Sequence, residues 1–283
     1  QQATSAAEQM WDVAGSEGVV EPEAIRSLVQ EMADAVLQNR NALLALTALR
    51  STDRYTFTHM VNVSILTMAQ ARGLGVDGAL LREFGVAGLM HDIGKVRTPR
   101  EILVKPDRLD EREYAVMKRH VLDGAEILRR SSDITPLAAI VSFEHHLRVD
   151  GSGYPAGVTR PALNLATMLT SIADVYDAMR SQRHYQQSFP SDRILAVLQA
   201  NSGREFEPNL VRRFVQLMGI YPAGSVVRLN TGVLAVVLRP YPLDPTRPRV
   251  RVVFDREGRR LEVPFDVDLW DVDRSPDRPS SVA

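Results

Sequence analysis

The sequence predicts a mainly α-helical chain that ends in a small antiparallel β module. Before Tyr221 and Pro222, apolar residues recur at the three-to-four-residue spacing of amphipathic helices. After Pro222 they fall into short β-branched runs, SVVRLN, VLAVVL, RVRVVF and LEVPF. The chain has no cysteine and no apolar run near the ~18–20 residues that a membrane helix needs, so the sequence predicts neither disulfides nor membrane spans.

The helices follow one another through the first 220 residues. Residues 22–49 carry apolar side chains on one face, among them Ile25, Val29 and Met32, as one amphipathic helix or a pair of helices would. Turns rich in glycine, proline and aspartate separate the further helical stretches, which are predicted at about 55–72, 77–90, 110–130, 133–146, 162–180, 190–201 and 207–219.

The β module is predicted from its turns as well as from its runs. Asn230-Thr231-Gly232 and Asp255-Arg256-Glu257-Gly258 stand where hairpins need tight turns. We interpret the module as a structural cap or a partner-docking surface. Four regions are expected: an N-terminal helical segment at 1–50, a helical domain at 51–220, the β module at 221–273 and a disordered tail at 274–283.

Composition narrows the class of protein. The chain carries 34 Lys and Arg against 35 Asp and Glu, so nothing favours broad binding to nucleic-acid polymers or anionic membranes, although a local basic pocket stays open. The first residue is Gln1 rather than methionine, which indicates a piece of a longer protein. Since no signal-peptide pattern is present, the expected location is the cytoplasm.

Histidine is scarce, and its positions are informative. Five of the six histidines fall at helix ends or on inner helix faces: His59, His91, His120, His145 and His146. Each alone is compatible with an ordinary core or surface histidine. Asp174 lies in an apolar helix and needs a compensating charge, either a cation or a salt bridge to an arginine. For Asp177, three residues later, the salt bridge is the preferred interpretation.

Together these residues predict a metal site. Imidazole and carboxylate without thiolate suit Fe or Mn, and also Zn, Ni or Co. With Asp92 and Asp174 the candidate ligands number seven, more than one ion needs, which indicates a pair of divalent metal ions. Such pairs are suited to the hydrolysis of phosphoesters.

The motifs, in their order, resemble the HD-GYP family, HD-superfamily phosphohydrolases that cleave cyclic di-GMP. The resemblance covers about residues 50–215, and it implies an HD-superfamily helical bundle for this part of the chain. It is carried by His59, His91-Asp92-Ile93-Gly94-Lys95, His120, His145-His146, Asp150-Gly151-Ser152-Gly153-Tyr154-Pro155 and Ala173-Asp174-Val175-Tyr176-Asp177-Ala178.

The resemblance also implies roles for single residues. One metal would lie among His59, His91, Asp92 and Asp174, and the other among His120, His145 and His146, with Asp92 between them. Lys95 and Asp92 would act in catalysis, with Lys95 contacting the scissile phosphate or the bridging hydroxide. Tyr154 would stack on a guanine or hydrogen-bond the substrate, or else anchor its loop. The expected substrate contacts are Lys95, Arg148, Asp150, Gly153, Tyr154 and Arg183; a salt bridge from Arg183 to Asp177 is the alternative, and His184 is expected at the surface.

Three positions depart from the family pattern. Leu147 replaces the glutamate that usually follows the histidine pair, which predicts the loss of a hydrogen bond that fixes the loop. Tyr55 stands where members with a third metal carry glutamate, so two metals are expected. Gln186 replaces a basic residue, so the phosphate contacts are expected to be weaker or different.

The leading hypothesis is a two-metal phosphodiesterase of bacterial signalling that hydrolyses cyclic di-GMP to pGpG and on to GMP. The first alternative is a sensor or interaction module that binds a cyclic dinucleotide with little or no turnover. The second keeps the fold with another phosphoester as substrate. An upstream regulatory domain, a GGDEF-type signalling partner and a homodimer are compatible with the resemblance.

Overall fold

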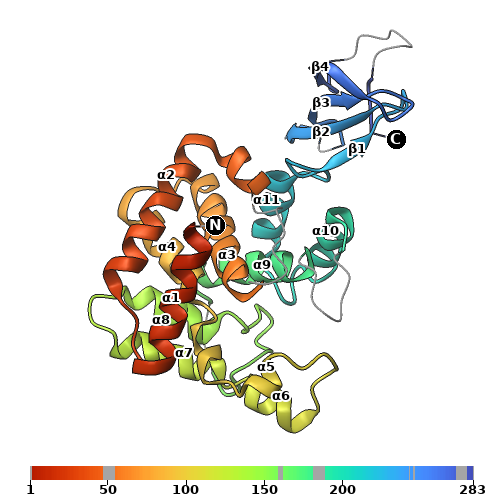
Figure 1. Cartoon of the computed structure of the whole chain (residues 1–283). Helices are drawn as coiled ribbons and strands as arrows, with labels where there is room; N and C mark the ends of the chain where they lie inside the picture. The colour runs from red at the N-terminus through yellow and green to blue at the C-terminus, as the bar shows by residue number, and fades with distance from the viewer. Residues whose placement is uncertain are drawn as a thin grey trace.

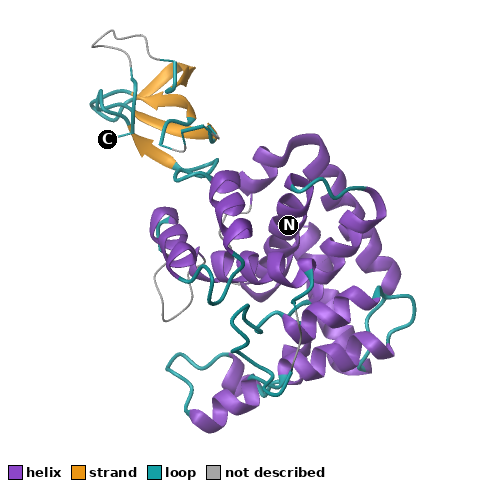
Figure 2. Cartoon of the chain, turned by 180° about the vertical axis from the view of Figure 1, so that it is seen from behind, coloured by secondary structure: helices purple, strands orange, loops and turns teal. Residues whose placement is uncertain are grey.

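The computed structural model describes residues 2–46, 55–158, 162–180, 189–241, 243–244, 246–271 and 279–282. A body of helices precedes a small sheet, which lies at one end of the molecule (Figures 1 and 2). The predicted fold class is confirmed. The helices are α1 (Gln2–Glu17), α2 (Pro22–Leu46), α3 (Tyr55–Gly73), α4 (Gly78–Met90), the 3-10 helix η1 (Ile93–Arg97), α5 (Arg100–Leu103), α6 (Glu111–Met117), α7 (His120–Arg130), α8 (Pro136–Glu144), α9 (Leu165–Arg180), α10 (Ser191–Ala200) and α11 (Pro208–Met218).

Helix α3 runs through the middle of the helical body and packs against α4 and α9. Its apolar residues, such as Met60 and Leu66, are fully buried. Buried polar side chains fix its position: Ser64 Oγ donates to the carbonyl of Gly85 at 2.7 Å, and Gln70 Nε2 donates to the carbonyl of Leu169 at 3.0 Å. Because an unsatisfied buried donor is costly, these bonds favour one register of α3 between its neighbours.

The stretch predicted as one helix at 110–130 is two helices. Helix α6 ends at Met117, a turn at Lys118 and Arg119 follows, and α7 begins at His120. The periodicity could not show the break, because both turn residues are polar and keep helix-like backbone angles. The break matters for the site, because it places His120 at the start of α7 rather than in the middle of one long helix.

The sheet is antiparallel with the strand order β1 (Val226–Arg228), β2 (Leu234–Arg239), β3 (Arg249–Phe254) and β4 (Arg260–Asp268). Both predicted turns contain a glycine with positive φ, Gly232 at 89° and Gly258 at 79°. Such angles are strained for other residues. The sheet has a hydrophobic core of its own, formed by Val227, Leu229, Ala235, Val237, Val250, Val252, Val267 and Leu269.

The tail differs from the predicted disorder where the structure describes it. Residues 279–282 lie against the start of the sheet: Val282 pairs with Leu229, and the Asn230 amide nitrogen donates to the Ser281 carbonyl at 3.0 Å. Asn230 also bonds Ser280 through its side chain at 3.1 Å. These contacts offset the conformational entropy that the segment loses on ordering. The polar, proline-rich composition, which predicted disorder, does not reveal them.

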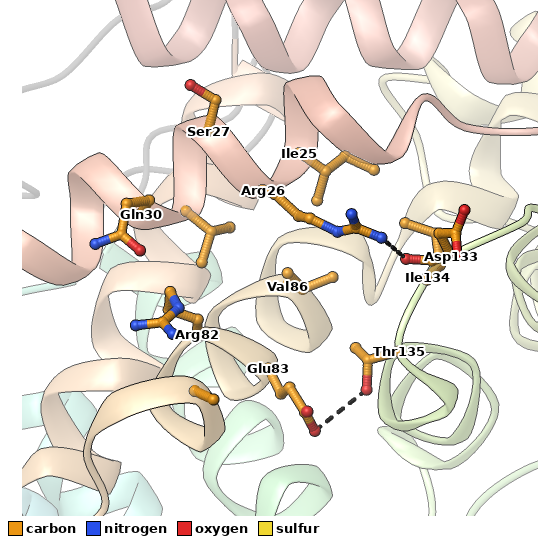
Figure 3. Close-up of a pocket in the computed structure, with 12 residues that line it drawn as sticks. Ile25, Arg26, Ser27, Gln30, Arg82, Glu83, Val86, Asp133, Ile134 and Thr135 are labelled. Atoms are coloured by element: carbon orange, nitrogen blue, oxygen red, sulfur yellow. Dashed lines mark hydrogen bonds between the residues drawn. The ribbon is translucent and has the colours of Figure 1, made fainter.

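A surface groove of about 700 Å³ lies between α2, α4 and the turn before α8 (Figure 3). Arg26 donates to the backbone carbonyl of Asp133, and Thr135 donates to Glu83 at 3.3 Å across the groove. Ile25, Val86 and Ile134 supply apolar lining. None of its lining residues belongs to the predicted site, so the groove is a separate feature of the fold.

Within the described ranges, no helix combines the length and the apolar character that a membrane crossing requires.

The two separate hydrophobic cores support the predicted boundary near residue 220, and a truncation tests it. A chain ending at residue 220 should unfold cooperatively with a Tm within about 5 °C of the full chain, because no residue of the sheet's core belongs to the helical core. Thermal unfolding followed by circular dichroism measures this. Loss of the cooperative transition would contradict the boundary and make the sheet part of one folding unit.

Candidate metal centre

The seven predicted ligands converge from three helices, α3, α7 and α9, and from the turns after α4 and α8. They form two groups, within each of which one ligand atom per residue lies within 4.8 Å of the others. Cluster 1 consists of His59 from α3, His91 after α4 and Asp174 from α9; cluster 2 consists of Asp92, His120 at the start of α7, and His145 and His146 after α8.

Cluster 1 is organised around the carboxylate of Asp174. Its Oδ1 lies 3.1 Å from Nε2 of His59 and 3.9 Å from Nε2 of His91. The other ring nitrogen of His59, Nδ1, lies 2.8 Å from Oδ2 of Asp177. Asp177 is fully buried, and it also accepts hydrogen bonds from Asn62 at 2.9 Å and from Arg180 at 3.1 Å. Asp177 therefore orients His59, and its expected salt bridge is present with Arg180.

Cluster 2 brings imidazole nitrogens close together. Nε2 of His120 lies 3.3 Å from Nε2 of His145 and 3.3 Å from Oδ1 of Asp92. Nδ1 of His120 bonds the Met117 carbonyl at 2.7 Å, and Nδ1 of His145 bonds the Ser142 carbonyl at 3.0 Å. A carbonyl only accepts, so each Nδ1 carries a proton, and it is Nε2 of each ring that faces the cluster.

Asp92 lies between the two clusters. Its Oδ2 is 3.3 Å from Nε2 of His91, while its Oδ1 faces His120 and lies 3.7 Å from Nε2 of His145. Lys95 Nζ also contacts Oδ2, at 2.5 Å, and its side chain is 23% exposed. One carboxylate thus faces both groups of imidazoles and a lysine.

The donor set fits metal ions. Among the described residues, the buried atoms His91 Nε2 and Asp92 Oδ1 have no hydrogen-bond partner. Leaving such atoms unsatisfied costs about 1–3 kcal/mol each. A divalent cation would satisfy both, and the imidazole and carboxylate ligands suit transition metals. The cluster can therefore hold metal.

Burial and charge set the protonation of the ligands. Burial lowers the pKa of His120 to about 3, and it holds the pKa of His146 well below its usual range, so both rings are neutral near pH 7. Burial also disfavours the charged form of His59, but hydrogen bonds to Asp174 and Asp177 raise its pKa to about 9. A metal in cluster 1 would replace the proton that links His59 to Asp174.

A close junction of three chain segments holds the clusters together. A Cβ atom at Gly94 of η1 would lie 2.0 Å from the carbonyl oxygen of His120 and 2.4 Å from the amide nitrogen of Gly124. A Cβ at Gly124 would lie 2.3 Å from Oγ of Ser142 in α8, which itself donates to the carbonyl of His91 at 3.0 Å. Only glycine allows η1 and α7 to approach this closely, and so the segment bearing His91 and Asp92 lies beside His120.

The loop after the histidine pair folds back on it. Leu147 and Gly153 form a bridge, and Gly153 has a φ of 96° with the His146 carbonyl oxygen 2.2 Å from where its Cβ would stand. Asp150 Oδ1 accepts from the Ser152 amide at 2.9 Å. Leu147 is 8% exposed. The loop is thus fixed by backbone and Asp150 contacts, and the glutamate absent at Leu147 is not needed to close it.

Tyr154 anchors this loop on the histidines. Its ring stacks on His146 with centroids 4.5 Å apart and an interplanar angle of 29°, and it meets His120 edge-on at 6.2 Å. The ring therefore packs against cluster 2, and its other contact is Tyr114 of α6, at 6.3 Å.

A cavity of about 440 Å³ opens next to the clusters. Three of the predicted substrate contacts line it: Arg148, Gly153 and Tyr154. Asp150 is used within the loop, and Lys95 faces Asp92. Arg183, His184 and Gln186 lie outside the described residues, as does the side chain of Tyr55. The full lining is Tyr114, Lys118, His145, His146, Leu147, Arg148, Gly153, Tyr154, Ser171, Asp174, Val175, Glu205 and Phe206.

The sequence interpretation missed Tyr114, Lys118 and Glu205 as lining residues. Arg148 forms an ion pair with Glu205, which follows α10 more than fifty positions later. No local pattern marks such a long-range pair. Tyr114 and Lys118 stood four residues apart within one predicted helix, a spacing that places them on one face, but nothing in the sequence showed which way that face pointed.

The helical fold and its histidine–aspartate clusters define a helical domain with a candidate metal site. The chain belongs to the HD domain family, whose model matches residues 30–210. The model described as "KOW domain associated with HD domain" matches residues 226–273, which include the sheet.

Curated relatives carry the more specific resemblance. The chain is 38% identical over 248 residues to the cyclic di-GMP phosphodiesterase PA4108 of Pseudomonas aeruginosa, covering 88% of this chain and 59% of that protein. It is 35% identical over 170 residues to the 3′3′-cGAMP-specific phosphodiesterase 2 of Vibrio cholerae, covering 60% of this chain and 33% of that protein. The chain therefore spans less than two thirds of the length of either relative.

Among solved structures, the chain is similar to Bd1817, an HD-GYP-type protein of Bdellovibrio bacteriovorus, with a TM-score of 0.62 and 19% identity over 75% of this chain and 68% of that one. At this identity the likeness shows the fold alone. With the HD family match and the named relatives, it confirms the HD-GYP resemblance predicted from the motifs.

The glycine junction gives a first test of how the centre is built. Gly94→Ala should lower the free energy of unfolding by about 1–3 kcal/mol, because its Cβ overlaps backbone that cannot rotate away. It should also reduce the bound metal, because η1 moves away from α7. Chemical unfolding and elemental analysis measure the two effects.

Gly15→Ala in α1 is the matched control, since its Cβ meets only Val96, at 4.0 Å. Equal stability and metal content in the two variants would contradict the junction.

Proposed function

We propose that this chain is a metal-dependent phosphodiesterase that hydrolyses cyclic di-GMP to pGpG, with further cleavage to GMP. The observation that carries the proposal is the position of Asp92, one buried carboxylate facing two groups of histidines. The names of the relatives, cyclic di-GMP phosphodiesterases among them, support the reaction.

We further propose a centre of two metal ions, iron or manganese, with Zn, Ni and Co as compatible substitutes. His59, His91, Asp92 and Asp174 would hold one ion. His120, His145, His146 and Asp92 would hold the other. Ions bound there would polarise the phosphate and lower the pKa of the attacking water.

The protein's own residues would bind and orient the substrate at this centre. Lys95 reaches Asp92 and is partly exposed, so its ammonium can contact the scissile phosphate and offset developing negative charge. Tyr154 stacks on His146, which restricts the orientation of that ring, and it lines the cavity. Asp177 holds the ring of His59. The contact with Asp92 holds the Lys95 ammonium at the centre.

Two alternatives remain distinguishable. Relatives named 3′3′-cGAMP-specific phosphodiesterases favour a mixed cyclic dinucleotide as the second candidate substrate. The sensor alternative is not favoured, because the named relatives are phosphodiesterases and the loop at Leu147 is well fixed. A cytoplasmic location, an upstream regulatory domain, a GGDEF-type partner and a homodimer stay predictions.

Turnover tests the proposal directly. The chain, loaded anaerobically with Fe²⁺ or Mn²⁺, should convert cyclic di-GMP to pGpG. Chromatography of the reaction mixture measures the product. A panel with 3′3′-cGAMP and linear dinucleotides should show the highest kcat/KM for cyclic di-GMP. Higher kcat/KM for 3′3′-cGAMP would favour the second candidate, and tight binding without product would favour the sensor.

The ligand sets predict the metal content of variants. His146→Ala should lower the metal bound per chain by about one equivalent, because cluster 2 loses a ligand while cluster 1 keeps all of its own. His91→Ala should remove the other equivalent, and the double variant should bind close to none. Elemental analysis of anaerobically purified protein gives the ratio, with circular dichroism to confirm folding. An unchanged ratio in His146→Ala would place the histidine pair outside the centre.

Asp177 should tune metal affinity without touching metal. Asp177→Asn keeps the shape but weakens the acceptor of the His59 ring, so the apparent affinity of cluster 1 should fall about 10–100-fold. Competition with a chelator measures it. Asp192→Asn, an exposed acid in α10, is the control and should bind metal like the unmodified chain. Equal affinities in both variants would show that Asp177 serves only the fold.

A further inference from the structure

Helix α6 is a loosely packed element beside the cavity. It buries none of its residues. Its start is held by a capping box between Asp110 and Glu113, and Lys105 binds the same Glu113 at 2.6 and 2.7 Å. Figure 1 shows α5 and α6 at the edge of the helical body, far from the sheet. A helix with so little burial is positioned by these polar contacts and by the segments that follow it.

One face of α6 forms a wall of the cavity. Tyr114, and Lys118 in the turn that follows α6, line it together with the histidine pair and Glu205. The Tyr114 ring meets Tyr154 edge-on and remains 47% exposed. The ammonium of Lys118 lies 4.9 Å from the Tyr114 ring centroid. An aromatic ring with an open surface and a neighbouring cation therefore stand together at the cavity.

The charges in the cavity single out Lys118. Of the two described cations in its lining, Arg148 is neutralised by Glu205. Lys118 has no carboxylate partner within 4.0 Å among the residues that the structure describes. A cation near a pocket without a fixed counter-ion can pair with an anionic ligand group at little desolvation cost, because it is still partly hydrated.

Only a short segment of chain separates Tyr114 and Lys118 from the candidate metal centre. Lys118 lies two residues before His120, and the Met117 carbonyl at the end of α6 accepts the hydrogen bond from His120 Nδ1. The aromatic ring and the cation are thus held on the segment that leads directly into cluster 2. A substrate reaching from cluster 2 into the cavity would meet them next.

A cyclic dinucleotide has two phosphates and two bases, and only one phosphate can be at the metals during a cleavage. We propose that α6 and the turn after it form the subsite for the other half of the substrate, in which Tyr114 stacks on the base and Lys118 pairs with the phosphate that stays intact. This inference rests on the proposed function and names a further substrate-binding element of the same site. Stacking on one aromatic ring is typically worth about 1–3 kcal/mol per base, and it accepts any purine.

Two substrates separate the subsite from the metal centre. Cyclic di-GMP fills both, whereas bis(4-nitrophenyl) phosphate has one phosphodiester and no nucleobase. In the metal-loaded full chain, Lys118→Gln and Tyr114→Ala should each raise KM for cyclic di-GMP about tenfold and leave kcat within about twofold. Both should hydrolyse bis(4-nitrophenyl) phosphate at the unmodified rate. Lys118→Arg and Tyr114→Phe should retain the KM of the unmodified chain.

Arg119→Gln is the matched control, because this neighbouring side chain is 71% exposed and does not line the cavity. Unchanged KM for cyclic di-GMP in Lys118→Gln and Tyr114→Ala would overturn the subsite. Equal losses on both substrates would overturn it as well, because α6 would then act through the metal centre.

If the unmodified chain cleaves bis(4-nitrophenyl) phosphate but not cyclic di-GMP, the proposed substrate fails, and binding decides the subsite separately. Calorimetric titration with cyclic di-GMP should then give a Kd about tenfold higher in Lys118→Gln and in Tyr114→Ala than in Arg119→Gln. Equal Kd values, or no binding to any of the proteins, would overturn the subsite.

Discussion

The carboxylate of Asp92 is the constraint on which the rest of the helical domain depends. It is 3% exposed and faces His91 on one side and His120 and His145 on the other. Burial alone would raise its pKa, but the charge of Lys95 holds it well below its usual range, so the group is ionised and needs positive charge around it. The glycine junction of η1 with α7 and the buried packing of α3 bring the candidate ligands of a cation around it, from α3, α7, α9 and the turns after α4 and α8.

Three of the histidines are oriented by the same kind of hydrogen bond, from the ring to a backbone carbonyl. His91, His120 and His145 each bond the backbone carbonyl three residues earlier, that of Gly88, Met117 and Ser142 respectively. The last carbonyls of a helix have no partner within it, so a histidine placed at the end of a turn can use one of them. The same bond fixes the tautomer and directs Nε2 inward. Each of these three histidines therefore follows the end of a helix, α4, α6 or α8, within three residues.

The sequence could predict what local chemistry encodes. The sheet and its turns follow from residue type and spacing, and so does a convergence of histidines and aspartates. The division of those ligands into two groups came from the family resemblance. The sequence could not predict the division into α6 and α7, since Lys118 and Arg119 are as common within helices as in the turn that they form here. The pairing of Arg148 with Glu205 and the contact of Val282 with Leu229 join distant segments. Such contacts depend on tertiary packing, which periodicity does not report.

The cavity has walls of unequal rigidity, and this difference bears on how a substrate would enter. On one side, the loop from Leu147 to Tyr154 is closed by backbone bonds and tied to His146 by ring stacking. On the other side, α6 buries no residue and is held by exposed or half-exposed polar contacts. Elements with few buried contacts open at low free-energy cost. Adjustment of the cavity to a ligand should therefore occur in α6, while the spacing of the metal ligands, set by the glycine junction, stays constant.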